Sequence, residues 1–178
     1  MADLSVRKAA KYIKARFLLV MGVSGAGKTS VGRALASRLD WDFYDADDFH
    51  PPENVAKMTR GAPLDDTDRA PWLASLHDLI SHCLRENRPG VLACSALKDR
   101  HRRQLLEGNR DVRIVYLKGD YDLIRSRLSA RPGHYMKSDL LQSQFQALEE
   151  PVDAFSVDIT PPLERITDLI IQSLIHEV

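Results

Sequence analysis

The chain has 178 residues, enough for one domain with a sizeable core, and its 25 Lys and Arg residues balance its 25 Asp and Glu residues. This balance gives no reason to expect nucleic acid or a membrane surface as a partner, and no apolar run approaches the roughly 20 residues of a membrane span. Two cysteines, Cys83 and Cys94, are too few for a disulfide scaffold, so we expect a reduced, cytoplasmic protein.

The N-terminal segment, residues 1–16, is basic. Its cations are Arg7, Lys8, Lys11, Lys14 and Arg16, and its one acid is Asp3. A transit peptide is conceivable, but the segment is poor in Ser and has no apolar core of the secretory type. We therefore expect a solvated N-terminal extension over 1–16 and a folded domain over 17–178.

Strand-length apolar runs alternate with helical patterns after residue 16. The predicted strands are Phe17–Met21, Trp41–Tyr44, Val91–Cys94, Val112–Leu117 and Phe155–Ile159. The predicted helices are Thr29–Leu39, Asn54–Arg60, Ala70–Glu86, Lys98–Glu107, Tyr121–Ser129, Ser138–Leu148 and Pro162–His176. This alternation predicts an α/β fold with helices on both faces of a five-stranded parallel sheet. Two segments interrupt it, His50–Trp72 and Ala130–Ser138, and both are candidate mobile pieces over a site at the strand ends.

A glycine-rich run between the first predicted strand and the first predicted helix fits the P-loop pattern Gly-x4-Gly-Lys-Ser/Thr. Its glycines let the backbone wrap closely around phosphates, and the helix N-terminus presents free N–H groups to them. Lys28 can reach the β- and γ-phosphates, and the Thr29 hydroxyl can bind Mg²⁺. The run predicts a P-loop NTPase fold whose nucleotide site is formed by Gly22, Ser24, Gly25, Ala26, Gly27, Lys28, Thr29 and Ser30.

Carboxylates follow the second predicted strand at Asp45 and Asp47. A two-residue step places both on the same side if the chain is extended there, facing the crevice at the strand ends. Asp45 can then hold Mg²⁺ together with Thr29, and Asp47 can accept a proton from an attacking hydroxyl. An alcohol acceptor profits from such a base, whereas a phosphate acceptor is already ionised. The alternative use of these residues is an acidic turn or a helix cap.

Further motifs lie beyond the P-loop. They are Asp45–Pro51 (D-x-D-x-x-H-P), Lys57–Leu73 (K-M-x-x-G-x-P-L-x-D-x-D-R-x-P-W-L), Cys94–Lys98 (C-S-A-L-K), Gly133–Tyr135 and Ser143–Phe145 (S-Q-F). From about Phe17 to the C-terminus the chain resembles the gluconokinases, small P-loop sugar-acid kinases akin to shikimate and adenylate kinases. The resemblance implies a fold like that of the nucleoside-monophosphate kinases with a lid over about 130–138, a homodimer, and ATP with Mg²⁺. It also implies phosphorylation of D-gluconate at its 6-hydroxyl.

The resemblance implies residue roles as well. Lys28, Asp47 and Arg131 would be the catalytic residues, and Arg131 would swing over the phosphates. Arg127 would stack on adenine. His50 would hydrogen-bond sugar hydroxyls or cap the turn at Pro51. Gln144 resembles a sugar-contacting position of the family. Five cations are candidates for binding the substrate carboxylate, and we expect two or three of the five to be real contacts: Lys57, Arg60, Arg69, Lys98 and His134.

Two other functions remain open. Another small-molecule P-loop kinase, of the shikimate or adenylylsulfate type, is the nearer one, although Ala93–Ala96 lacks the glycine run that shikimate kinases usually carry after the third strand. A non-catalytic nucleotide-binding module is the second, although the chain has no N-K-x-D guanine signature. ADP release in the presence of gluconate separates a kinase from a binding module.

Overall fold

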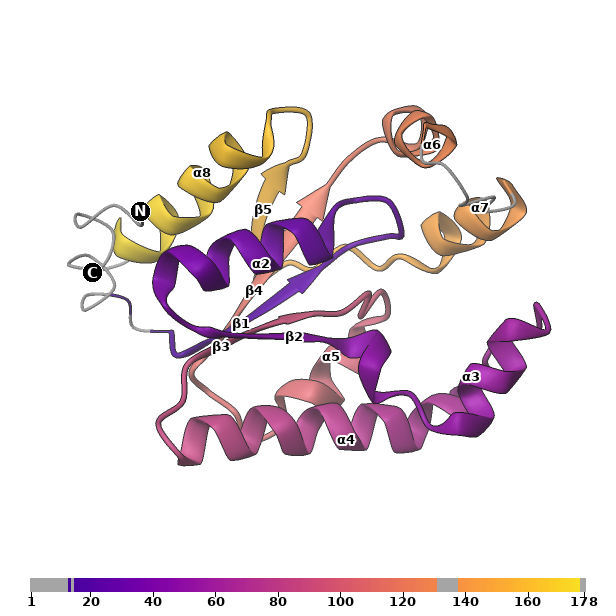
Figure 1. The fold of residues 1–178 in the computed structure, drawn as a ribbon, viewed down its shortest axis with the longest axis horizontal. Coiled ribbons are helices and arrows are strands. Elements are labelled where there is room, and N and C mark those ends of the chain that lie inside the picture. Colours follow the sequence, from indigo (N-terminus) through magenta and orange to yellow (C-terminus); the bar gives the residue numbers. More distant parts are fainter. Residues whose placement is uncertain (1–12, 14, 131–137, 177–178) are drawn as a thin grey trace.

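Five parallel strands form the centre of the molecule (Figure 1). The computed structural model describes Ile13 and residues 15–130 and 138–176. The strands lie in the order β2-β3-β1-β4-β5. Their bounds are β1 (Phe17–Met21), β2 (Asp42–Asp45), β3 (Gly90–Ala93), β4 (Val112–Lys118) and β5 (Phe155–Asp158). β1 pairs in parallel with β3 on one side and with β4 on the other, so it is the central strand. The loop that follows β1 therefore begins at the middle of the edge formed by the carboxyl ends of the strands.

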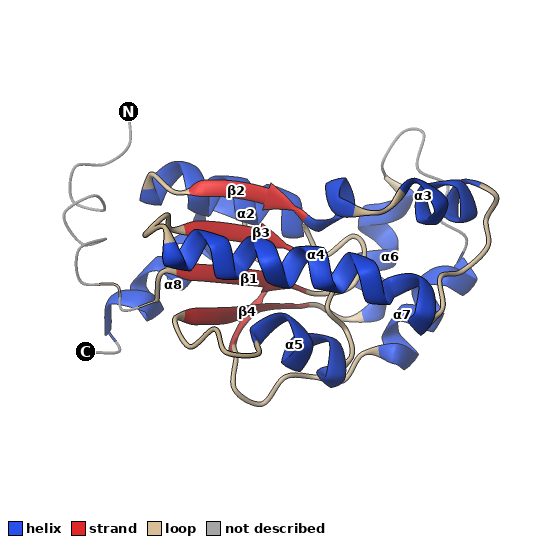
Figure 2. Ribbon diagram, turned by 90° about the horizontal axis from the view of Figure 1, so that it is seen from below, coloured by secondary structure: helices blue, strands red, loops and turns tan. Residues whose placement is uncertain are grey.

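Helices cover both faces of this sheet, which confirms the predicted fold class. Their bounds are α2 (Lys28–Leu39), α3 (Pro52–Thr59), α4 (Asp66–Arg85), α5 (Asp99–Leu106), α6 (Tyr121–Ser129), α7 (Ser138–Ala147) and α8 (Leu163–His176), with a 3₁₀ helix η2 at Ala46–Phe49. α2 and α8 lie on one face, and α4 and α5 lie on the other, where Figure 2 shows α4 running along the strands. No helix among these described residues is both long and apolar enough to span a bilayer.

The central strand explains why the run Phe17–Met21 is apolar throughout. All five of its residues are fully buried. Leu18 and Val20 pack into the cluster on the side of α2 and α8, and the alternate residues pack into the cluster on the side of α4. A strand covered on both faces cannot alternate apolar with polar residues, so it appears in the sequence as a continuous apolar run.

α4 begins at Asp66, four residues before the predicted start at Ala70. A capping box explains the difference. The Asp65 carboxylate accepts from the Asp68 N–H at 2.9 Å, and the Asp68 carboxylate accepts from the Asp65 N–H at 2.8 Å. Pro71 therefore lies inside the helix instead of in its first turn.

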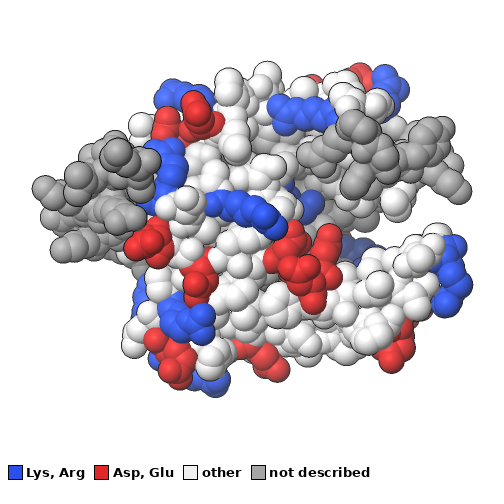
Figure 3. All heavy atoms as spheres, in the orientation of Figure 1, with Lys and Arg blue, Asp and Glu red and all other residues white. Residues whose placement is uncertain are grey.

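The segment His50–Trp72, expected to interrupt the regular structure, contains α3 and the first turns of α4. The second segment, Ala130–Ser138, was predicted to form a lid, and its residues 131–137 lie outside the described residues. In the space-filling view the molecule is hollowed between α3 and the part that carries α7, and both signs of charge are interspersed over this face (Figure 3).

Candidate active site

The P-loop connects β1 to α2, and its shape depends on glycine. Gly27 has φ +95° and Gly25 has φ +85°, conformations that residues with a Cβ rarely adopt. A Cβ at Gly25 would also lie 2.8 Å from Leu128 of α6. Because Gly27, at the N-cap of α2, has no side chain to cap the helix, the first N–H groups are available to an anion. This arrangement is a phosphate cradle.

Lys28 lies over the loop that precedes it. Its ammonium donates a hydrogen bond of 3.1 Å to the carbonyl of Val23. The thiol of Cys94, at the end of β3, is fully buried, and burial is the main reason why its pKa is raised to about 12. The charge of Lys28 lowers the pKa of this thiol, while the charges of Asp47 and Asp45 raise it. The P-loop lysine and both carboxylates therefore gather around the same strand end.

The Thr29 hydroxyl donates a hydrogen bond of 2.9 Å to Oδ2 of Asp45. Oδ1 of Asp45 accepts from the N–H of Asp47 at 3.2 Å. Asp47 lies in η2, so the chain there is not extended as the sequence analysis assumed, and Asp45 acts as the N-cap of η2. The hydroxyl and carboxylate oxygens of Thr29 and Asp45 are hard ligands of the kind that Mg²⁺ binds, so this pair fits the predicted metal site.

His50 stacks on Trp72, with ring centroids 4.5 Å apart and planes at 10°. The Trp72 indole donates a hydrogen bond of 2.8 Å to the carbonyl of Ala46 and so ties this stack to η2. Nδ1 of His50 is buried and has no hydrogen-bond partner among the described residues, so it does not cap the turn at Pro51. Burial is the main reason why the pKa of His50 is lowered. The charge of Asp47 opposes this shift and the charge of Arg69 adds to it, so His50 lies near both charges.

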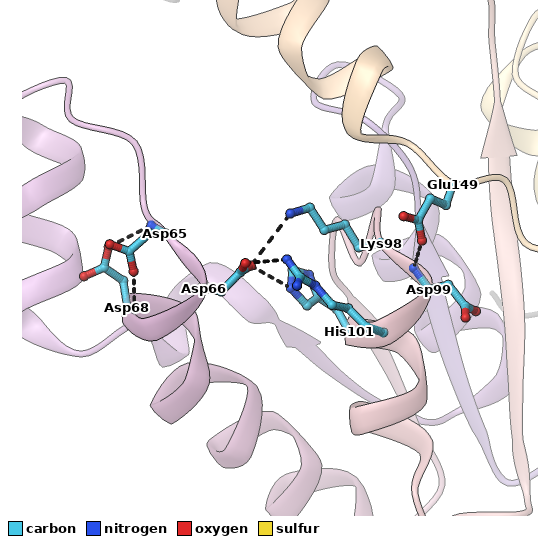
Figure 4. Close-up of polar contacts among 8 residues, drawn as sticks. Asp65, Asp66, Asp68, Lys98, Asp99, His101 and Glu149 are labelled. Carbon is cyan, nitrogen blue, oxygen red and sulfur yellow. Dashed lines mark hydrogen bonds and ion pairs between the residues drawn. The ribbon is translucent and has the colours of Figure 1, made fainter.

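Two of the predicted substrate cations are paired with carboxylates. Lys57 lies 2.5 Å from Asp68 and 3.7 Å from Asp65, and its hydrogen bond with Asp68 is the main reason why the pKa of Lys57 is raised. Lys98 lies 3.7 Å from Asp66 (Figure 4). Two other predicted cations have less defined surroundings: Arg60 is exposed at the end of α3, and Arg69 is half-buried on α4.

Asp66 binds two further groups from the start of α5. Arg100 donates to its Oδ2, and Nε2 of His101 lies 3.4 Å from its Oδ1. Burial disfavours ionisation of Asp66, but Arg100, Lys98 and His101 outweigh it and lower the pKa of the carboxyl. Asp66 thus joins the first turn of α4 to the segment that carries Lys98, a connection that the sequence analysis missed (Figure 4).

The loop after β3 is held by groups that the sequence analysis also missed. Ala96 has φ +40°. The buried Arg102 donates to the carbonyls of Ala96 and Leu97 at 3.0 and 2.9 Å. Glu149, which follows α7, accepts from the N–H of Asp99 at 2.6 Å and so caps α5 (Figure 4). No local pattern distinguishes Arg102 from the exposed arginines around it, so only its contacts reveal its role.

The side chains predicted to contact adenine and the sugar, Arg127 and Gln144, form hydrogen bonds with other residues of the protein. Arg127 donates a hydrogen bond of 2.7 Å to the carbonyl of Ile159. Oε1 of Gln144 accepts from the N–H of Ser24 at 2.7 Å, and its Nε2 donates to the Ser24 hydroxyl at 3.0 Å. The predictions for Arg131 and His134 fall on residues outside those that the structure describes.

A P-loop between the central strand and α2, with carboxylates after β2, defines a small-molecule P-loop kinase. Residues 24–159 match the shikimate kinase family model. The chain is 45% identical over 177 residues to a probable gluconokinase of Mus musculus, covering 88% of this chain and 96% of that protein. It is also 45% identical over 152 residues to the thermoresistant gluconokinase of Escherichia coli K12, covering 83% of this chain and 87% of that protein.

A solved structure agrees with these sequence comparisons. The crystal structure of a gluconokinase from Sinorhizobium meliloti 1021 superposes with a TM-score of 0.81 at 40% identity, and the match covers 92% of each chain. Identity at this level over most of the length goes beyond the shared P-loop fold. The chain belongs to the gluconokinase family.

Proposed function

We propose that the protein transfers the γ-phosphoryl group of ATP to the 6-hydroxyl of D-gluconate, which gives 6-phosphogluconate and ADP. The observation that carries this proposal is the chain of hydrogen bonds from the Thr29 hydroxyl, in the residue after the P-loop lysine, through the Asp45 carboxylate to the backbone N–H of Asp47, in a chain of this family. It combines a phosphate cradle with a carboxylate that can serve an alcohol nucleophile.

Each group has a distinct task in this proposal. Lys28 and the N–H groups at the start of α2 bind the β- and γ-phosphates. The carboxylate of Asp47 accepts the proton of the 6-hydroxyl. The oxygen of this hydroxyl forms the new bond to the γ-phosphorus, while the bond between the γ-phosphorus and the oxygen that leaves with ADP breaks. Thr29 and Asp45 would hold Mg²⁺, which neutralises phosphate charge when it is bound.

The acid end of gluconate needs cations. Lys57 and Lys98 are half-buried and paired with Asp68 and Asp66, so their positions are restrained before a substrate arrives. Arg60 lies at the C-terminal end of α3, which borders the hollow, and Arg69 lies on α4. Charge-assisted hydrogen bonds from two or three of these groups would fix the carboxylate of gluconate. The roles of Arg127, Arg131 and His134, a homodimeric assembly and a cytoplasmic location remain predictions.

A coupled assay of ADP release tests the reaction, with gluconate, glucose, shikimate and AMP as acceptors. Glucose lacks the carboxylate and would leave desolvated cations unpaired, so we expect gluconate to exceed it by at least about 10³ in kcat/KM. Circular dichroism is used to check that Lys28→Ala is folded, and this variant should then have almost no turnover. Comparable turnover of glucose, or a preference for shikimate or AMP, would overturn the substrate assignment.

A further inference from the structure

One peptide unit of the P-loop is bound from both sides by side chains. The carbonyl of Val23 accepts from Nζ of Lys28 at 3.1 Å. The N–H of the same peptide unit, which belongs to Ser24, donates to Oε1 of Gln144 at 2.7 Å. The C=O and N–H of a trans peptide point in opposite directions, so Lys28 and Gln144 fix this unit from opposite edges. Hydrogen bonds at the two ends of one peptide also polarise each other.

Gln144 is well placed to hold this unit. Its Nε2 donates to the Ser24 hydroxyl at 3.0 Å, so both ends of its amide bind a residue 120 positions away in the sequence. α7, which carries Gln144, is anchored by the buried Leu141 and by the edge-to-face packing of Phe145 on Tyr121, whose ring centroids are 5.5 Å apart. The amide therefore projects from a fixed helix, and its orientation agrees with both hydrogen bonds.

We propose that Gln144 is a positioning residue for the γ-phosphate: it orients the Val23–Ser24 peptide and, through it, Lys28, so that the P-loop binds a nucleoside triphosphate in preference to a diphosphate. The proposal rests on the proposed use of ATP. Lys28 reaches both the β- and the γ-phosphate, and its γ-phosphate contact exists only with the triphosphate, whereas the N–H groups at the start of α2 hold the β-phosphate in either nucleotide. Loss of the Gln144 contact should therefore weaken binding of the triphosphate more than binding of the diphosphate.

This role differs from the sugar contact predicted from the sequence. The amide accepts from and donates to the nucleotide-binding loop, and it uses both of its ends to do so. A sugar contact would change the KM for gluconate alone. A γ-phosphate positioning role changes nucleotide discrimination even when no gluconate is present.

The test compares the affinities for the β,γ-imido analogue of ATP and for ADP, each with Mg²⁺, by titration calorimetry on the full chain. In Gln144→Met, which keeps the length of the side chain but removes the amide, we expect the analogue to bind at least about tenfold more weakly and ADP to change less than about twofold. Ser24→Ala, which removes one of the two hydrogen bonds, should show a smaller loss of the same kind. Gln146→Ala, at an exposed position of the same helix, is the matched control and should change neither affinity.

Circular dichroism and thermal melts establish that each variant is folded, and Ser24→Ala provides the test if Gln144→Met is not. Equal losses for the analogue and ADP, or a change confined to the KM for gluconate, would overturn the proposal. Failure of the unaltered protein to bind the analogue would instead refute its use of ATP. Turnover of gluconate by the unaltered protein tests the proposed function separately.

Discussion

Thr29 and Asp45 belong to different elements, and the Thr29 hydroxyl donates a hydrogen bond of 2.9 Å to the Asp45 carboxylate. Thr29 lies in the first turn of α2, and Asp45 is the last residue of β2. Because β1, β3 and β2 are parallel neighbours in this order, the end of β2 lies at the same edge of the sheet as the P-loop that follows β1. The pair joins the phosphate cradle to the carboxylates at the end of β2 and just after it.

Asp45→Asn tests this pair as the magnesium site. The amide keeps an oxygen that accepts from Thr29 but removes the negative charge that a hard cation prefers. We expect the Mg²⁺ concentration for half-maximal activity to rise at least about tenfold, measured by titration of Mg²⁺ at saturating ATP. Asp42→Asn on the same strand, where the carboxylate pairs with Arg88, is the control. An unchanged Mg²⁺ requirement would contradict the assignment.

Asp47→Asn should lower kcat by roughly 10² to 10⁴, the usual scale for the loss of general base assistance. The substitution is nearly isosteric, so the affinity for ATP should change little. Steady-state kinetics in both substrates give the answer, and Asp48→Asn, an exposed neighbour in η2, is the control. A higher KM for gluconate with normal kcat would make Asp47 a binding residue instead.

Lys98→Met should raise the KM for gluconate at least about tenfold while leaving the KM for ATP unchanged, because a charge-assisted hydrogen bond to the acid would be lost. Loss of its partly exposed ion pair with Asp66 should affect stability little. Lys118→Met, which removes a similar exposed pair with Glu150 elsewhere on the molecule, is the matched control. The idea fails if both variants have the same KM for gluconate.

Arg102→Leu should reduce the free energy of unfolding by about 3 kcal/mol, because the carbonyls of Ala96 and Leu97 would lose a buried donor. Urea denaturation measures this change. Arg103→Leu, one residue further along α5 with a side chain 81% exposed, should change stability by less than about 0.5 kcal/mol. Similar values for the two variants would show that Arg102 does not support the loop.

We expect His101 to make the free energy of unfolding depend on pH. Burial lowers its pKa below the ordinary 6.5, Asp66 opposes this shift, and Arg100 and Arg69 add to it. Below about pH 6.5 the unfolded chain binds more protons at this site than the folded chain does, so the free energy of unfolding falls as the pH drops toward the folded pKa. His50, whose pKa is also lowered, acts in the same direction.

Urea denaturation between pH 5 and pH 8 checks this sign. His101→Gln should make the free energy of unfolding fall less steeply below about pH 6.5, whereas the same substitution at the exposed His82 should leave the dependence as it was. A steeper fall in His101→Gln would contradict the argument.

The sequence by itself determined the elements and the phosphate site. Periodicity of apolar residues is a local property, and it placed all five strands and the helices between them to within a few residues. The P-loop is equally local, because its glycines and its lysine are adjacent in the chain. Errors came where a cap decided the boundary, as at Asp65 before α4, or where the chain turned, as at Asp47 in η2.

Only the tertiary structure decided which distant groups meet. Arg102 appears in the sequence as one arginine among several, yet it is buried beneath the loop after β3. Asp66 binds a segment from the start of α5, and Gln144 binds Ser24 across 120 residues. Such contacts depend on how strands are ordered and helices are packed, because residues far apart in the chain become neighbours only when the sheet brings their elements together. The residue type alone says what a side chain can bind, and the fold says what it reaches.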